Sequence, residues 1–442
     1  MTAFISLIIV LHAILSFKKP LWGLCALLAI KILIPDNARN PFIDISLNTT
    51  CSLVLFAAWV VNAFGKKYLL DGLRNVMFRY LLFFIVFSVA IMFVTPYVPI
   101  TAQVSPLFAF IVLQICPVIV AMSVIRGRED LEKVVKTFLV SALVCVVYSL
   151  VCFILKIPYP YNELFNSQFG GRDNNLENVI AQVMGDVMGR CMGTATSGTY
   201  DYGMVIAIVF TTVGAIYYKT RSKVSLVVFI LCGLDVLCTT RRSPLITAMV
   251  FLAVMFFADS RNRARNLKYA LIGLVVAISC VYIFPQLRSF RNIIETSLFF
   301  WDDSVAARNN VSGSSVSFRA FQFEHTLRYI QDSPFFGNGW GSPFYKSRFP
   351  EMIGWESIVF TTLMQFGYVG AIVWALLFYR FYKYSAMHKD KVIGAAFIIS
   401  AVVMCILTDT IYHFFIFFGA VLIHKMSVYY VPIEDAKPLR LV

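Results

Sequence analysis

The sequence predicts an all-α protein that crosses a membrane about 12 or 13 times. Of its 442 residues, 59% are hydrophobic and 14% are charged, and the mean hydropathy is +0.76. A helix needs roughly 20 apolar residues to cross a bilayer core, and apolar runs of this order recur along the whole chain. Lysine and arginine gather in alternate connections between these runs. This pattern is typical of a polytopic helical membrane protein.

The clear apolar runs are 77–94, 104–125, 134–155, 200–218, 224–239, 244–258, 269–284, 357–382, 392–407 and 414–430. Shorter runs at 3–17, 21–34 and 47–64 complete the expected set. No cleaved signal peptide is expected, because the first run lacks a basic leader and is followed by Lys18-Lys19-Pro20. The expected organisation is an N-terminal bundle 1–284 with an outer loop 157–199, a large outer loop 285–354, and C-terminal helices with a short tail, 355–442.

The net charge of +14 comes largely from loops on one side of the predicted membrane. Of the 38 basic residues, 24 cluster near 18–19, 66–79, 126–136, 219–223, 261–268, 380–391 and 425–440. The positive-inside rule assigns these loops to the cytoplasm. The connections 35–46, 95–103, 157–199, 240–243, 285–354 and 408–413 are then expected to face outward. Since the charge is distributed over membrane loops, a nucleic-acid partner is not expected.

Cysteine usage indicates neither a disulfide framework nor a metal site. Nine of the ten cysteines lie in or beside apolar runs, and only Cys191 lies well inside an expected outer loop. The sequence contains no CxxC pair and no Cys/His cluster. No metal and no cofactor are therefore predicted.

The large outer loop contains a segment with helical periodicity. The spacing gives an apolar face of Ala320, Phe323, Leu327 and Ile330, and a polar face of Arg319, Gln322 and Thr326. Asp332-Ser333-Pro334 should end this helix, because the residue before proline is biased out of the helical region. We expect an amphipathic helix against the outer mouth of the bundle, followed by a glycine turn at 337–341.

Arginines on the outward side need a chemical reason, because positive charge is normally kept off that side. They are Arg190, Arg241, Arg242, Arg288, Arg291, Arg308, Arg319 and Arg328. Guanidinium groups form bidentate hydrogen bonds to phosphate oxygens, so a converging set would suit a lipid-linked phosphate or diphosphate. The alternative is that they bind lipid headgroups or pair with Asp302, Asp303 and Glu324.

Four motifs resemble the Wzy/WaaL-type family of O-antigen polymerases and ligases. Arg190-Cys191-Met192-Gly193-Thr194 is similar to the Arg-x-x-Gly-Thr motif that precedes a span in the family. Thr240-Arg241-Arg242-Ser243 is similar to the Ser-Arg turn of the family. The stretch 317–341 resembles its arginine followed by a proline- and glycine-rich segment, and 356–370 resembles the motif that opens the next span. The first 150 residues carry no such motif.

This resemblance implies a GT-C-like glycosyltransferase at the periplasmic face of a bacterial inner membrane. The donor and acceptor would be oligosaccharides on undecaprenyl diphosphate, and a chain-length regulator is an implied partner. Arg319 and Arg242 would stabilise the diphosphate leaving group, which needs charge stabilisation rather than an acid. Glu356, where ligases of the family usually have histidine, would accept the proton of the acceptor hydroxyl. A salt bridge is the alternative role for Glu356.

Further residues are expected to bind the substrate: Arg190, Arg241, Arg288, Arg291, Arg328, Trp340 and His413. Trp340 would lie at the membrane interface or stack on sugar, and His413 would line the substrate path unless its role is structural. His325 is expected to be solvated or at an interface. Asp235, inside an apolar run, suggests function, with a buried hydrogen bond as the equal alternative.

Three functions stay open, in this order: a polymerase of lipid-linked repeat units that makes O-antigen, capsule or exopolysaccharide, a ligase that transfers glycan to a lipid A core, and a lipid-linked oligosaccharide flippase or other permease. A transporter would hold its charges deep in a central cavity. Here the arginines gather at one mouth, which favours catalysis on one face.

Overall fold

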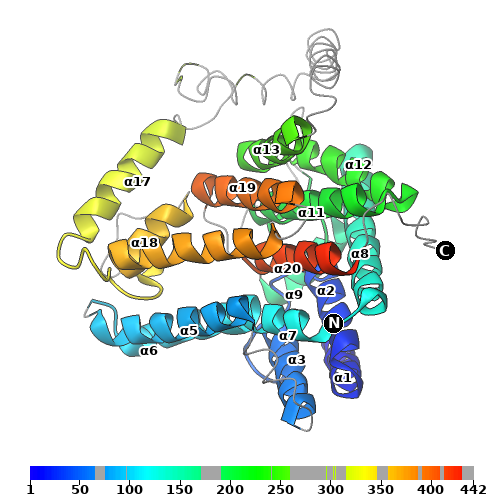
Figure 1. The fold of residues 1–442 in the computed structure, drawn as a ribbon, viewed down its shortest axis with the longest axis horizontal. Coiled ribbons are helices and arrows are strands. Elements are labelled where there is room, and N and C mark those ends of the chain that lie inside the picture. The colour runs from blue at the N-terminus through cyan, green and yellow to red at the C-terminus, as the bar shows by residue number, and fades with distance from the viewer. Residues whose placement is uncertain are drawn as a thin grey trace.

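The computed structural model describes residues 1–64, 75–95, 97–170, 191–239, 241–258, 295, 302, 304, 315–345, 357–386, 391–408 and 413–430. These ranges form helices, with one isolated bridge between Arg39 and Ser46 and no strand (Figure 1). The helices are α1 Thr2–Lys18, α2 Pro20–Leu33, α3 Leu47–Phe64, α5 Val76–Val94, α6 Ile100–Phe110, the π-helix η1 Ile111–Ile115, α7 Cys116–Val124, α8 Arg128–Leu155, α9 Pro160–Phe169, α11 Thr199–Thr220, α12 Lys223–Cys238, α13 Arg242–Ala258, α17 Ser315–Tyr329, the 3-10 helix η3 Ser342–Phe344, α18 Ile358–Ser385, α19 Lys391–Leu407 and α20 His413–Tyr429.

Helices long and apolar enough to cross a membrane confirm the prediction of an all-α polytopic membrane protein. Among the described residues five qualify: Val76–Val94, Ile100–Val124, Arg128–Leu155, Asp201–Thr220 and Ile358–Ser385. Shorter apolar helices such as Lys391–Leu407 and His413–Tyr429 accompany them. The expected span 269–284 lies outside the described residues, so the number of about 12 or 13 spans stays a prediction.

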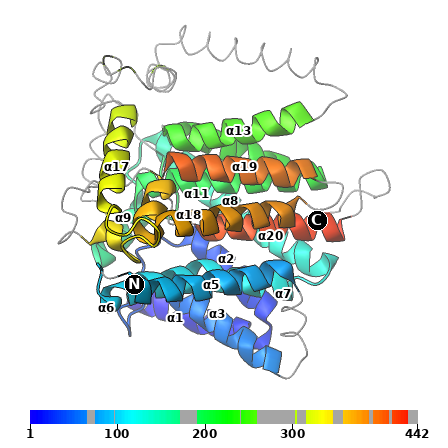
Figure 2. The same cartoon turned by 60° about the vertical axis from the view of Figure 1, so that its left-hand side comes forward.

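The C-terminal helices pack into one layered bundle around α20. Figures 1 and 2 show α18, α19 and α20 running side by side, with α13 beyond α19 and α5 beside α18. Most residues of α20 between His413 and Ile423 are buried, so this helix forms the centre of the core. The helix α17 lies across one end of α18 and α19 in both views.

The two ends of the bundle differ in the residues that they carry. Lys219, Lys223 and Lys391 lie at helix ends on one side, where Lys425 also donates to the Ile125 carbonyl at 2.7 Å; we name this side the basic end. The opposite side, where α19 ends and α13 begins, is named the arginine end. This grouping agrees with the predicted alternation of loops. The side that faces the cytoplasm stays a prediction.

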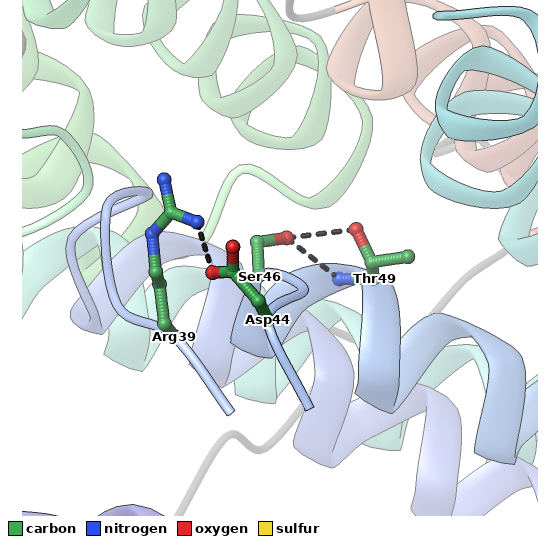
Figure 3. Close-up of polar contacts among 4 residues, drawn as sticks. All are labelled: Arg39, Asp44, Ser46 and Thr49. Atoms are coloured by element: carbon green, nitrogen blue, oxygen red, sulfur yellow. Dashed lines mark hydrogen bonds and ion pairs between the residues drawn. The ribbon is translucent and has the colours of Figure 1, made fainter. Parts of the chain in front are cut away.

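The expected outer loop 35–46 folds into a compact turn that leads into α3. Arg39 and Asp44 form an ion pair across it, and Ser46 caps α3 by accepting from the Thr49 N–H at 3.0 Å (Figure 3). Asp36 accepts from the Ser197 N–H at 2.8 Å. Two expected outer loops, 35–46 and 157–199, therefore meet on the same side of the molecule.

The helix α18 is broken at Gly367, whose φ of 61° and ψ of −161° are not helical. In an unbroken helix the N–H groups of Tyr368 and Val369 would bond to the carbonyls of Met364 and Gln365. The break would leave these four groups without partners inside the protein, which costs free energy for each buried polar group.

The glycine-rich segment 334–339 supplies the missing partners. Tyr368 N–H donates to Pro334 O at 2.9 Å, Val369 N–H to Phe335 O at 3.1 Å, Asn338 N–H to Met364 O at 2.8 Å, and Gly339 N–H to Gln365 O at 2.9 Å. The backbones approach so closely that a Cβ on Gly337 would lie 2.6 Å from Gln365, and one on Gly367 2.5 Å from Pro334. The predicted glycine turn is confirmed. Because segment 334–339 binds the backbone on both sides of the break in α18, we name it the clamp.

Replacing Gly367 by alanine should destabilise the protein, because the new methyl group meets the Pro334 carbonyl and because the positive φ is strained for any L side chain. The strain alone costs about 1 to 3 kcal/mol. Gly170→Ala is the matched control, since Gly170 also has a positive φ but has open space around its Cβ position. We expect a lower thermal midpoint in detergent for Gly367→Ala than for Gly170→Ala. Equal midpoints would show that the close contact does not matter.

Candidate active site at the arginine end

The last residue of α19, Leu407, is contacted from two other helices. Arg319 of α17 donates from its guanidinium to the Leu407 carbonyl at 2.9 Å, and the Ser243 hydroxyl of α13 donates to the same oxygen at 3.5 Å. The last carbonyls of a helix have no partner within the helix, so this oxygen can accept from outside. Two of the expected arginine segments, around 241–243 and 319, therefore meet at one point.

The first turns of α11 and α13 pack against each other beside this point. Gly203 of α11 leaves little room: a Cβ there would lie 3.0 Å from Pro244 and 3.6 Å from the Arg241 side chain. Thr408, directly after α19, donates to the Met204 sulfur at 3.4 Å. Arg241, Arg242 and Arg319 are all half-buried. The arginine end thus collects α11, α13, α17 and α19.

The helix α17 turns its polar face toward the protein. Gln322 and Thr326 are buried to 1% and 0% exposure, whereas Phe321 and Phe323 are 43% and 46% exposed. The predicted helix is confirmed. Of the predicted apolar face, Ala320 and Phe323 are exposed but Ile330 is buried, whereas the predicted polar face with Arg319, Gln322 and Thr326 is turned toward the protein. The exposed phenylalanines suit contact with lipid, while the polar face covers the arginine end.

Arg328 lies apart from this group. It is exposed near the other end of α17, about 13 Å along the helix from Arg319 at 1.5 Å per residue. Its guanidinium lies over the Tyr329 ring, 5.5 Å from the ring centre. The structure therefore does not bring Arg328 to the Leu407 position.

Four predicted site residues lie outside the described residues: Glu356, Arg190, Arg288 and Arg291. The immediate neighbours of two of them are described. Ser357 caps α18 by accepting from the Val359 N–H at 3.2 Å, so Glu356 directly precedes a helix start at the arginine end. Cys191 N–H donates to the carbonyl of Cys238 at 3.1 Å, so Arg190 directly precedes a residue that is fixed to the end of α12.

Trp340 and His413 are buried among other rings. The Trp340 indole donates to the Ser88 carbonyl at 3.2 Å and packs on Phe110 and Phe366. His413, at the start of α20, is 7% exposed and also lies against Phe110. Because neither ring faces open space, we assign both a packing role and leave them out of the proposed site.

An apolar groove of about 470 Å³ runs between α18 and α19. On α18 it is lined by residues such as Ile358, Thr362 and Ala375, and on α19 by Val402, Cys405 and Ile406. Ile358 follows the Ser357 cap, and Ile406 precedes Leu407, whose carbonyl binds Arg319. The groove therefore begins beside the arginine contacts and extends along the apolar helices toward the basic end.

Asp235 of α12 is fully buried and serves a hydrogen-bond network. It accepts from the Ser149 hydroxyl of α8 at 2.7 Å and from the Tyr202 hydroxyl of α11. The Tyr202 ring in turn fills the space beside Gly193, where a Cβ would lie 2.3 Å away. Of the two expected roles for Asp235, the geometry favours the buried hydrogen bond, which holds the Arg-x-x-Gly-Thr segment in place.

Fold and site together define a polytopic all-α membrane protein with arginines gathered at one end of its bundle. Within the described residues, no group of three or more His, Cys, Asp or Glu side chains is placed to hold a metal ion. Residues 226–375 match the family model described as O-antigen ligase, which confirms the resemblance to the Wzy/WaaL type. The match supports a membrane O-antigen polymerase or ligase. No curated protein matches the chain.

Proposed function

We propose that this protein is a polymerase that joins oligosaccharide repeat units carried on undecaprenyl diphosphate. The observation that carries the proposal is the meeting of Arg319 with the 241–243 turn at the end of α19, beside the start of α18 and the apolar groove. Cationic groups next to an apolar groove are complementary to a lipid with an anionic head. The arginine end would face the periplasm, as the positive-inside rule predicts.

In the proposed reaction the acceptor hydroxyl attacks the first carbon of the donor sugar. A new glycosidic bond forms, the bond from that carbon to the diphosphate breaks, and the diphosphate leaves on its lipid. Arg319 and Arg242 stabilise the negative charge that develops on the leaving oxygen. Glu356 accepts the hydroxyl proton, because it is ionised near neutral pH with a reference pKa of about 4.3.

The groove between α18 and α19 would hold part of the polyprenyl chain of the donor. Its lining is almost entirely apolar, and two of the lining residues, Val359 and Tyr379, are exposed at the surface of the bundle. Each buried methylene of a lipid chain contributes about 0.8 kcal/mol. The groove would therefore align the lipid so that its diphosphate lies beside Arg319.

A ligase is the second candidate, and the family description favours it. Both reactions use the same donor, whereas the acceptor is a second lipid-linked glycan in one and a lipid A core in the other. We place the polymerase first because position 356 is glutamate where ligases of the family usually have histidine. The arginines spread over several outer segments also suit two anionic lipids.

Arg319→Lys and Arg242→Lys should each lower turnover roughly 10- to 150-fold, because loss of a charge-assisted hydrogen bond costs about 1.5 to 3 kcal/mol. A lysine keeps the positive charge but cannot form the two parallel hydrogen bonds that a guanidinium makes to a phosphate. Glycan chain length and rate at equal protein levels measure the effect. Arg380→Lys, at the basic end, is the control and should behave like the wild type. Full activity of the two site variants would assign these arginines to topology or lipid contact.

Ala375→Trp should reduce turnover at limiting donor by about tenfold or more, since the indole fills the groove and displaces lipid carbon. Leu376→Trp adds a similar ring to the next residue of α18, which does not line the groove, and should leave turnover unchanged. The measurement is polymer formation in membranes supplied with graded donor. If both variants behave alike, the groove does not hold the donor.

Deletion of the protein should leave single repeat units on their final carrier, and Glu356→Gln should behave like the deletion while the protein stays inserted. In a host that makes lipopolysaccharide, gel analysis decides between the candidates. A band of core plus one repeat supports the polymerase. Loss of all surface glycan, with polymer accumulating on the lipid carrier, would identify a ligase instead.

A further inference from the structure

Two cysteines that are distant in sequence come together at the arginine end. Cys191 precedes α11 in the Arg-x-x-Gly-Thr segment, and Cys238 is the last residue of α12. The Cys191 N–H donates to the Cys238 carbonyl at 3.1 Å. A backbone hydrogen bond joins two residues through only a few covalent bonds, so it brings their Cα atoms to the scale of about 4.4 to 6.8 Å that a disulfide requires.

The side chains are neighbours as well. Burial, followed by the adjacent Cys238 thiol and the Asp235 carboxylate, raises the pKa of the Cys191 thiol. Both residues are thiols in the structure, Cys191 fully buried and Cys238 half-buried. The pair therefore has the backbone proximity and the side-chain proximity for a cross-link, and one of the two residues, Cys238, is only half-buried.

We propose that Cys191 and Cys238 form a disulfide in the mature protein, which fastens the Arg190 segment to the end of α12. The proposal rests on the outward orientation of the arginine end given above, because disulfides persist in the periplasm and outside the cell but are rare in the cytosol. Cys238 lies three residues before Arg241. The bond would thus join two segments that carry expected anion-binding arginines.

The oxidation is a thiol–disulfide exchange with an external disulfide donor of the periplasm. The Cys238 thiolate attacks the donor disulfide and releases one donor thiol. The Cys191 thiolate then attacks the mixed disulfide, forms the Cys191–Cys238 bond and releases the second donor thiol. The two cysteines lose two electrons and two protons, and the donor disulfide gains both.

The burial of Cys191 determines whether oxidation comes before or after the 191–198 segment packs. A thiol with a raised pKa is a poor attacking group, so oxidation is fast only before the 191–198 segment packs onto α12. Once the segment has packed, the burial of Cys191 limits the access of reductant to its sulfur. We therefore expect the disulfide to form during membrane insertion and to resist mild reductant in the folded protein.

Peptide mass spectrometry of the full-length protein tests the proposal. Cells are quenched with acid, and thiols are blocked with N-ethylmaleimide in denaturant. We expect the peptides that contain Cys191 and Cys238 to be joined without reductant and separate after reduction. Cys191→Ser and Cys238→Ser should each abolish the joined peptide, whereas Cys232→Ser, which removes a buried thiol of α12, should retain it. In a host without periplasmic disulfide donors, both cysteines should be blocked as thiols.

Thermal unfolding gives a second measurement. The two single serine variants and the double variant should show the same lowered midpoint in detergent, because either substitution removes one shared bond. Recovery of both cysteines as blocked thiols from an oxidising host would overturn the proposal. Labelling of Glu324→Cys, exposed on α17, with an impermeant thiol reagent in intact spheroplasts then tells whether orientation or cysteine geometry was at fault. None of these measurements requires glycan synthesis, so they succeed or fail independently of the polymerase activity.

Discussion

The break in α18 at Gly367 is the constraint on which the rest of the site depends. A membrane-embedded helix can lose intrahelical hydrogen bonds only if other protein groups replace them, since lipid offers none. Here the segment 334–339 replaces two broken bonds with four new ones. The exchange fixes the end of the large loop against the bundle and so determines where α17 lies.

The same helix connects the other parts of the site. Its first turn begins at Ser357, its outer half is clamped by the loop, and one face lines the apolar groove toward α19. Gln365 contributes a further bond, since its side chain accepts from the Gly341 N–H at 3.2 Å. A change in the position of α18 would therefore displace the loop, alter the groove and move the helix start together.

Periodicity and charge predicted most of the fold, because apolar runs and basic loops report directly on the membrane. The helix α17 and its polar face also followed from spacing. The choice of face did not, since Gln322 and Thr326 are buried by tertiary contacts that outweigh hydropathy. The same limit applies to Trp340 and His413, whose residue types suit both ligand binding and packing.

The partner of Trp340, which directly follows segment 334–339, was not predictable either. Gln103, at the start of an apolar run, accepts from the Trp340 N–H at 2.9 Å across more than 200 residues. Nothing in its local sequence marks it, because the pairing depends on how two loops meet. Similarly, Asp235 stood out as an acid in an apolar run, but its partners Ser149 and Tyr202 belong to helices that only the fold brings together.

The hydrogen bond from Arg319 to the Leu407 carbonyl gives the guanidinium an acceptor within the protein itself. The carboxyl end of a helix carries a partial negative charge of about half a unit. The end of α19 therefore takes the place that an anion would occupy, and it holds the guanidinium oriented and partly desolvated. A phosphate oxygen with a full charge is a stronger acceptor than this carbonyl. Binding would then be an exchange of one acceptor for a better one, with little of the reordering that a solvated arginine on a loop would require.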